Sequence, residues 1–194
     1  MEKHLFLTGP AGCGKSAAIR QALGPALQGA GGFVTLPERN EGSYLLRCSL
    51  QPSAAAGGVD GFEALPYLDL ACDPPWHDNE VFRTEGVRLL QESNWYPFSV
   101  LDAIGGFELL IPQFREALAE VLNAPQPLVG VLIARKEAEA LCRRLGLGER
   151  VRMNIEQLWK ALKADSDTRI VELAGLSRHR ALRCLEQWAQ EYAR

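Results

Sequence analysis

Short apolar runs alternate along this chain with stretches that carry polar residues on one side. Runs at residues 4–8, 98–101 and 128–133 have the length and continuity of buried strands. Residues 16–23 and 112–122 contain good helix formers. The second of these helices places four apolar side chains on one face: Phe114, Ala117, Leu118 and Val121. Strands alternating with helices predict a three-layer α/β/α fold with a mainly parallel sheet.

Weaker patterns complete this outline. Further strands are predicted at 32–35, 43–48 and 151–153, further helices at 24–28, 135–145 and 156–163, and a turn at 29–32. A turn at 40–42 would join the first two of these strands into a hairpin. Residues 51–80 are rich in Pro, Gly, Ala and Asp, which predicts loops and one short strand.

Composition narrows the class of protein. The chain has 194 residues and 47% hydrophobic content, enough for one domain with a real core. Its net charge of −3 argues against a nucleic-acid surface covering the whole chain. No apolar run has membrane-spanning length, and the first is too short for a signal peptide. Five scattered cysteines without a C-x-x-C pair indicate neither a zinc site nor a disulfide framework, so a reduced, cytoplasmic setting is expected.

The segment Gly9–Ser16 carries the clearest chemical signal. It reads GPAGCGKS and fits G-x-x-x-x-G-K-[ST], the phosphate-binding loop or Walker A motif. An apolar run precedes it and a predicted helix follows, which is the context the motif requires. The nucleotide-binding residues predicted from it are Gly9, Pro10, Ala11, Gly12, Cys13, Gly14, Lys15 and Ser16.

Each residue type in this loop has a physical reason. Glycines let the backbone curl and bring several N–H groups close to phosphate oxygens. The following helix directs its positive dipole end at the same anion. Lys15 would reach the β- and γ-phosphates, and the hydroxyl of Ser16 would coordinate Mg²⁺.

A magnesium site of this kind needs an acid at the end of a neighbouring strand. Asp102 follows the buried run 98–101 and fits this Walker B position. Ser16 and Asp102 are therefore the predicted metal ligands. Asp69, which ends a poorer strand candidate, is the alternative acid. In many proteins of this type a Glu follows the Walker B Asp, and here that position is Ala103.

Three segments resemble one family of P-loop nucleoside triphosphatases, typified by thermophilic bacterial enzymes and the human cancer-related nucleoside triphosphatase. They read HLFLTGPAGCGKS, GFVT and LDAIGGFEL, at residues 4–16, 32–35 and 101–109. The family forms are similar: HVFLTGPPGVGKT, GFYT and IDEIGxMEL. The resemblance covers roughly residues 3–160. It implies a P-loop fold and Mg²⁺-dependent hydrolysis of nucleoside triphosphates to diphosphates, with ATP or GTP as ligand.

Departures from the family pattern bear on catalysis. Ala103 replaces the family's Glu, the pair Gly105-Gly106 replaces a segment with Lys, and Leu36-Pro37 replaces an acidic pair. A methyl group neither accepts a proton nor positions a water. Glu108 matches a family acid further along the loop, so Lys15 and Glu108 are the catalytic candidates. Nucleotide binding is expected, with hydrolysis weak or lost.

Two alternatives stay open. One is a nucleotide-dependent regulator that does not hydrolyse and acts through a protein partner. The other is a small-molecule kinase, in which an acceptor hydroxyl replaces water. Arg135 and Lys136 follow the strand that ends near 134 and would lie at the ligand edge of the sheet, with plain surface charge as the simpler interpretation.

The chain is expected to divide into a P-loop domain at 1–164 and a helical hairpin at 165–194. In the tail, helices are predicted from 167 and from 176, separated by Gly175, and the segment 170–188 resembles a helix-turn-helix. The tail is formally neutral, which argues against DNA binding because affinity for DNA rests mainly on phosphate neutralisation. A helical cap or a protein-docking hairpin is the preferred interpretation.

Overall fold

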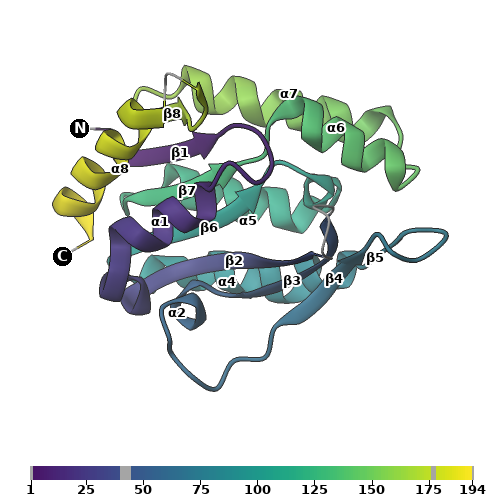
Figure 1. Ribbon diagram of the computed structural model, residues 1–194, viewed down its shortest axis with the longest axis horizontal. Coiled ribbons are helices and arrows are strands. Elements are labelled where there is room, and N and C mark those ends of the chain that lie inside the picture. Colours follow the sequence, from purple (N-terminus) through teal and green to yellow (C-terminus); the bar gives the residue numbers. More distant parts are fainter. Residues whose placement is uncertain (1, 40–44, 176–177, 194) are drawn as a thin grey trace.

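The computed structural model describes residues 2–39, 45–175 and 178–193. Within these ranges one eight-stranded sheet runs through the molecule in the order β5-β4-β3-β2-β6-β7-β1-β8 (Figure 1). The strands are β1 (His4–Thr8), β2 (Ala30–Arg39), β3 (Leu45–Pro52), β4 (Leu65–Asp69), β5 (Trp76–His77), β6 (Phe98–Ile104), β7 (Leu128–Leu132) and β8 (Thr168–Glu172).

The sheet has a parallel half and an antiparallel half. Strands β2, β6, β7, β1 and β8 run parallel, whereas β3, β4 and β5 extend the sheet antiparallel from β2. The predicted hairpin is present as β2 and β3, although its turn at 40–42 lies outside the described residues. The predicted turn at 29–32 is wrong, because residues 30–32 already pair with β6. The layered α/β fold with a mainly parallel sheet is confirmed.

Helices cover both faces of the parallel half. They are α1 (Lys15–Leu23), α2 (Ser53–Ala56), α3 (Asn79–Val81), α4 (Val87–Glu92), α5 (Pro112–Asn123), α6 (Arg135–Arg144), α7 (Glu149–Ala164) and α8 (Arg178–Tyr192), with shorter turns η1 (Gly24–Gly29), η2 (Phe82–Gly86), η3 (Ser93–Trp95) and η4 (Phe107–Leu110). Side chains of β1 alternate between the faces: Leu5 and Leu7 pack with α1 and α8, and Phe6 packs with α5, α6 and α7. Burial on both faces explains the uninterrupted apolar runs of β1 and β7.

Two glycines allow the inner strands to approach closely. A Cβ on Gly32, where φ is +83°, would lie 2.3 Å from the carbonyl oxygen of Val100. A Cβ on Gly130 would lie 2.6 Å from that of Leu101. Glycine within a strand commonly marks such an approach, and here it brings β6 between β2 and β7, with Asp102 at the end that carries the phosphate-loop motif.

The predicted strand at 151–153 is wrong, because these residues belong to α7. Val151, Ile155, Trp159 and Leu162 are its buried positions, and their spacing of three to four residues is that of a helix. Three residues, two of them apolar, are too few to show this period. The helix predicted at 156–163 is the second half of the same element.

The tail also differs from its prediction. Residues 168–172 form β8, which pairs with β1 in the register Phe6↔Ile170, so a helical hairpin over 165–194 is wrong. Helix α8 is present, but a helix-turn-helix over 170–188 is excluded because a strand occupies the place of its first helix. Ile170 and Val171 face opposite sides of the sheet, next to the two separate cores. Pairing with β8 gives β1 a neighbour on the side away from β7, where it would otherwise be an unpaired edge.

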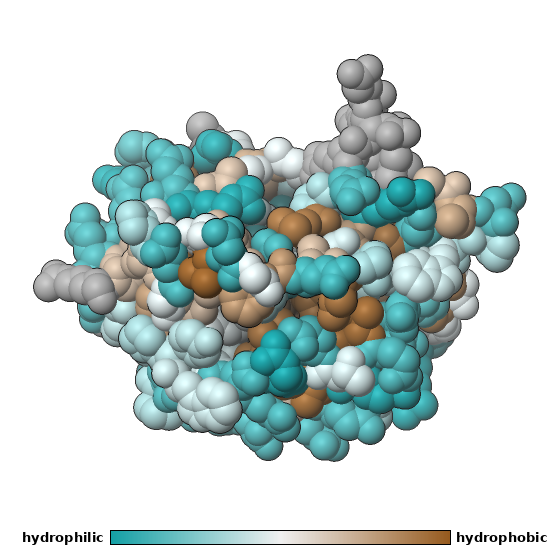
Figure 2. Space-filling view, turned by 90° about the horizontal axis from the view of Figure 1, so that it is seen from below, coloured by the Kyte–Doolittle hydropathy of each residue, from teal (hydrophilic) through white to brown (hydrophobic). Residues whose placement is uncertain are grey.

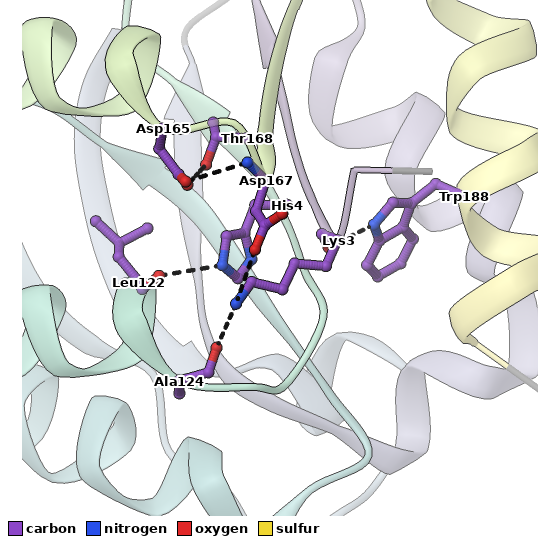
Figure 3. Close-up of polar contacts among 8 residues, drawn as sticks. All are labelled: Lys3, His4, Leu122, Ala124, Asp165, Asp167, Thr168 and Trp188. Carbon is purple, nitrogen blue, oxygen red and sulfur yellow. Dashed lines mark hydrogen bonds and ion pairs between the residues drawn. The ribbon is translucent and has the colours of Figure 1, made fainter.

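Polar contacts fasten the amino end of β1 to this tail and to the end of α5 (Figure 3). The indole Nε1 of Trp188 donates to the carbonyl of Lys3 at 2.9 Å, and Lys3 Nζ donates to the carbonyl of Ala124 at 3.0 Å. His4 Nε2 lies 3.1 Å from the carbonyl of Leu122, and burial lowers the pKa of His4, which favours the neutral imidazole as donor. Trp188 is 1% exposed and meets the ring of Phe98 edge-on.

The antiparallel half forms the lower part of the molecule in Figure 1. Seen from that side, apolar areas lie among hydrophilic ones (Figure 2). Phe62 and Trp76 belong to this half and are nearly half exposed. No helix in the described part of the chain is long and apolar enough to cross a membrane.

Candidate functional site

The loop from Gly9 to Gly14 joins β1 to α1 at the carboxyl end of the parallel strands. Gly9, Gly12 and Gly14 have φ values of +134°, +75° and +93°, a region that glycine adopts readily and other residues rarely do. Gly14 caps α1 in the left-handed conformation. Pro10, Ala11 and Gly12 are exposed at the crest of the loop. The strand, loop and helix predicted around the motif are therefore present.

Lys15 begins α1 and folds across the loop. Its ammonium Nζ donates to the carbonyls of Gly9 at 2.7 Å and Pro10 at 2.8 Å, and lies 3.8 Å from the sulfur of Cys13. Since Lys15 reaches the loop from the N-terminus of α1, its charge adds to the positive end of the helix dipole. The combination concentrates positive potential where the loop amides gather.

Ser16 and Asp102 meet across the site. The Ser16 hydroxyl donates to Asp102 Oδ1 at 3.0 Å, although the two residues come from α1 and β6. Asp102 is 4% exposed, and burial raises the pKa of its carboxyl to about 6, opposed by the Ser16 hydrogen bond and the charges of Arg20 and Lys15. A hydroxyl and a carboxylate are hard oxygen donors, which fits the chemistry of Mg²⁺.

Ser16 and Asp102 fit a metal ion whose remaining ligands would come from bound phosphates and water. Within the described ranges, no group of three or more His, Cys, Asp or Glu side chains could hold a metal. Mg²⁺ is usually bound by one or two carboxylates together with substrate phosphates and waters, so two protein oxygens beside a phosphate loop suffice. Asp69, the alternative acid, lies in the antiparallel half and binds Arg47 at 2.7 Å.

Glu108 points into its own loop. It is 3% exposed, and its Oε1 accepts hydrogen bonds from the backbone N–H groups of Gly105 at 2.6 Å and Gly106 at 2.8 Å. Burial raises the pKa of this carboxyl, and the backbone hydrogen bonds oppose that rise. Ala103 packs its methyl group against the core on the α1 side.

Two side chains that the motifs do not include contact the phosphate loop. Glu137, in the first turn of α6, accepts a hydrogen bond from the backbone N–H of Ala11. Arg178, the first residue of α8, donates from Nη1 to the carbonyl of Cys13 at 2.6 Å. Glu137 could have been found from the sequence, because it is an acid in the first turn of the helix that follows an inner strand. No comparable pattern indicated Arg178, which lies far from Cys13 in the chain.

Arg135 faces a cleft beside the start of the loop. Its guanidinium lies 5.0 Å from the ring centre of Trp159, and Lys163 Nζ lies 5.6 Å from the same ring. These three residues line the cleft together with Thr8, Gly9, Ala134 and Glu172. Arg135 thus lies at the ligand edge as expected and packs against Trp159 of α7, and both Arg135 and Lys136 are exposed.

Comparison with known proteins bears on the fold. No family model matches the chain, and no curated protein matches it. The structure is similar to the crystal structure of THEP1 from the hyperthermophile Aquifex aeolicus, with a TM-score of 0.60 and 15% sequence identity. The match covers 94% of this chain and 96% of that chain. At this identity the likeness shows the fold alone, an α/β fold whose mainly parallel sheet is covered by helices on both faces.

The coverage also bears on the tail. A segment from 165 to 194 lying wholly beyond the shared fold would leave far more of this chain uncovered than the match does. The tail therefore contributes to the common architecture. Its strand β8 and its contacts with β1 agree with this.

Proposed function

We propose that this chain binds a nucleoside triphosphate together with Mg²⁺ at residues 9–16 and hydrolyses it slowly to the diphosphate. The observation that carries the proposal is the hydrogen bond of 3.0 Å between Ser16 and Asp102, directly after a glycine-rich loop that Lys15 crosses. A hydroxyl on the helix that follows the loop and a buried carboxylate on a neighbouring strand form the pair that P-loop NTPases require. An ordinary glycine-rich turn would need neither.

The loop residues would bind and orient the triphosphate. Backbone N–H groups from Ala11 to Ser16 would donate to phosphate oxygens, helped by the positive end of α1. Lys15 would exchange its two carbonyl acceptors for β- and γ-phosphate oxygens, gaining charge-assisted hydrogen bonds. Ser16 and Asp102 would hold Mg²⁺, which when bound neutralises charge on the β- and γ-phosphates.

Hydrolysis is the weaker part of this function. Ala103 offers only a methyl group where a water-positioning acid is common, and the Glu108 carboxylate is bound to two amides of its own loop. Loss of a positioning acid commonly lowers a rate about 10²–10⁴-fold. The same two residues favour a second candidate, a nucleotide-dependent regulator that binds without turnover.

Equilibrium binding and phosphate release test the proposal together. We would measure the Mg²⁺-dependent Kd of non-hydrolysable ATP and GTP analogues, and phosphate release from ATP and GTP, for wild type, Ser16→Ala and Asp102→Asn. Asp69→Asn is the matched control, since it removes an acid from the end of another strand. Mg²⁺-dependent binding that both site variants weaken and the control keeps would support the proposal. Absence of binding in wild type would refute it.

A further inference from the structure

We infer that Glu137 is the acid that orients the attacking water, in the role for which Ala103 has no functional group. This inference rests on the proposed function. It starts from one contact: the Glu137 carboxylate accepts a hydrogen bond from the backbone N–H of Ala11, at the exposed crest of the phosphate loop. The acid comes from α6, which follows the inner strand β7, and not from β6 as the usual acid does.

The contact fixes where this carboxylate lies relative to a bound triphosphate. An oxygen that accepts from a loop N–H occupies a position that a phosphate oxygen would take in the complex. When a phosphate takes that N–H, the Glu137 carboxylate is released, but its backbone stays in the first turn of α6. The carboxylate then stays beside the phosphate, where it can accept a hydrogen bond from a water, and this is the contact that a water-orienting acid makes.

The other acids near the loop have different tasks. Asp102 accepts from Ser16 and is buried, and Glu108 accepts from the amides of Gly105 and Gly106. Glu137 is only half-buried, so its carboxylate has room to move from the Ala11 amide to a water. Among the described residues it is the carboxylate that combines a hydrogen bond to a backbone amide of the phosphate loop with access to solvent.

The reaction balances with this residue as base. The water oxygen forms a bond to the γ-phosphorus while the bond from that phosphorus to the β–γ bridging oxygen breaks. The water proton passes to the Glu137 carboxylate and then to the released phosphate, so the products are nucleoside diphosphate and inorganic phosphate. No further reactant is required.

The arrangement gives Glu137 a double effect that separates it from a structural residue. Its negative charge competes with phosphate for the Ala11 amide, so it weakens binding, while its carboxylate accelerates hydrolysis. Glu137→Gln should therefore tighten the Kd of a non-hydrolysable ATP analogue about two- to fivefold, as expected for one partly exposed charge. The same change should lower kcat about 10²–10⁴-fold. A merely structural role would weaken binding and turnover together.

The experiment compares wild type, Glu137→Gln, Glu137→Asp and Glu139→Gln in single-turnover hydrolysis of ATP and GTP, alongside analogue binding. Glu139 lies two residues further along α6 and controls for the change in net charge. Tighter binding with slower turnover in Glu137→Gln, partial recovery in Glu137→Asp and wild-type behaviour in Glu139→Gln support the inference.

The results that would overturn the inference also separate it from the proposed function. Wild-type turnover in Glu137→Gln overturns the role of Glu137 alone. Tighter binding with undiminished turnover shows that Glu137 only shields the empty loop, which also overturns it. A wild-type protein that binds the analogue and releases no phosphate overturns hydrolysis and with it the role of Glu137, while one that binds nothing overturns the proposed function itself.

Discussion

The two ends of β1 carry dense polar contacts of different kinds. At the amino end, Trp188 and Lys3 donate to backbone carbonyls that the fold holds in place (Figure 3). At the carboxyl end, the loop groups of Ala11 and Cys13 bind side chains that reach in from α6 and α8. A buried indole has no other partner available, whereas a half-buried carboxylate can exchange its partner for water or an anion.

This difference predicts that the amino end of β1 contributes to the stability of the fold and that its carboxyl end takes part in ligand binding. Trp188 and His4 are almost completely buried, so breaking their hydrogen bonds would leave buried polar groups unpaired. Pro10, Ala11 and Gly12 are exposed, and their backbone groups can change partner at little cost. Substitutions at the amino end should change the free energy of unfolding, and substitutions at the carboxyl end should change nucleotide binding. Variants at the two ends of β1 test this division.

Lys15→Ala should remove most of the affinity for nucleotide. Two charge-assisted hydrogen bonds to phosphate, each contributing about 1.5–3 kcal/mol, correspond to a loss of affinity of roughly 10²–10⁴-fold. Titration of a fluorescent ATP or GTP analogue with Mg²⁺ measures this. Lys160→Ala, on the exposed side of α7, controls for the lost charge and should bind like wild type. Unchanged affinity in Lys15→Ala would remove the phosphate loop from the account.

Trp188→Ala should lower the free energy of unfolding and leave nucleotide affinity unchanged. Truncating a buried Trp commonly costs about 3–5 kcal/mol, which denaturant unfolding would report as a lower midpoint. Trp188→Phe keeps most of the ring packing and loses the hydrogen bond to Lys3, so about 1 kcal/mol is expected. The nucleotide Kd of the folded fraction should stay at the wild-type value in both. A shift in Kd without loss of stability would break the comparison.

Arg178→Ala should weaken nucleotide binding by about fivefold. The guanidinium holds the Cys13 carbonyl at 2.6 Å, which helps to keep the loop amides facing the ligand, and one net hydrogen bond contributes about 1 kcal/mol. Arg180→Ala, two residues along α8, carries the same charge change and should leave the nucleotide Kd unchanged. Equal effects of the two variants would show that only the local positive potential matters.

Glu108→Gln should leave turnover within a few-fold of wild type and change how stability depends on pH. Because burial raises the folded-state pKa of Glu108 above its ordinary 4.5, the protonated form stabilises the fold below that value. This stabilisation is lost as pH rises through the raised pKa. Denaturant unfolding across this window should show a flatter curve for Glu108→Gln, which keeps an oxygen for the two glycine amides. A large loss of kcat would instead support the prediction from the sequence that Glu108 is catalytic.

The sequence predicts the parts of this site that lie close together in the chain. The phosphate loop is one contiguous segment, and Asp102 directly follows a buried strand, so both can be predicted from the sequence. Glu137 and Arg178 contact the loop only because β7 and β8 flank β1, and strand order cannot be read from local patterns. The edge strand β8 was mistaken for a helix because its neighbour on β1, and not its own composition, determines its conformation. The strand predicted at 151–153 is wrong because a segment of three residues is too short to show a period.

The most direct test of the central claim is a backbone amide NMR titration of the wild-type protein with Mg²⁺ and a non-hydrolysable nucleoside triphosphate analogue. The account predicts the largest chemical-shift changes at residues 11–16 and at Glu137, with Lys3, His4 and the indole N–H of Trp188 almost unchanged. Saturating analogue that leaves the loop amides unmoved, or that moves mainly the amino end of β1, would contradict it.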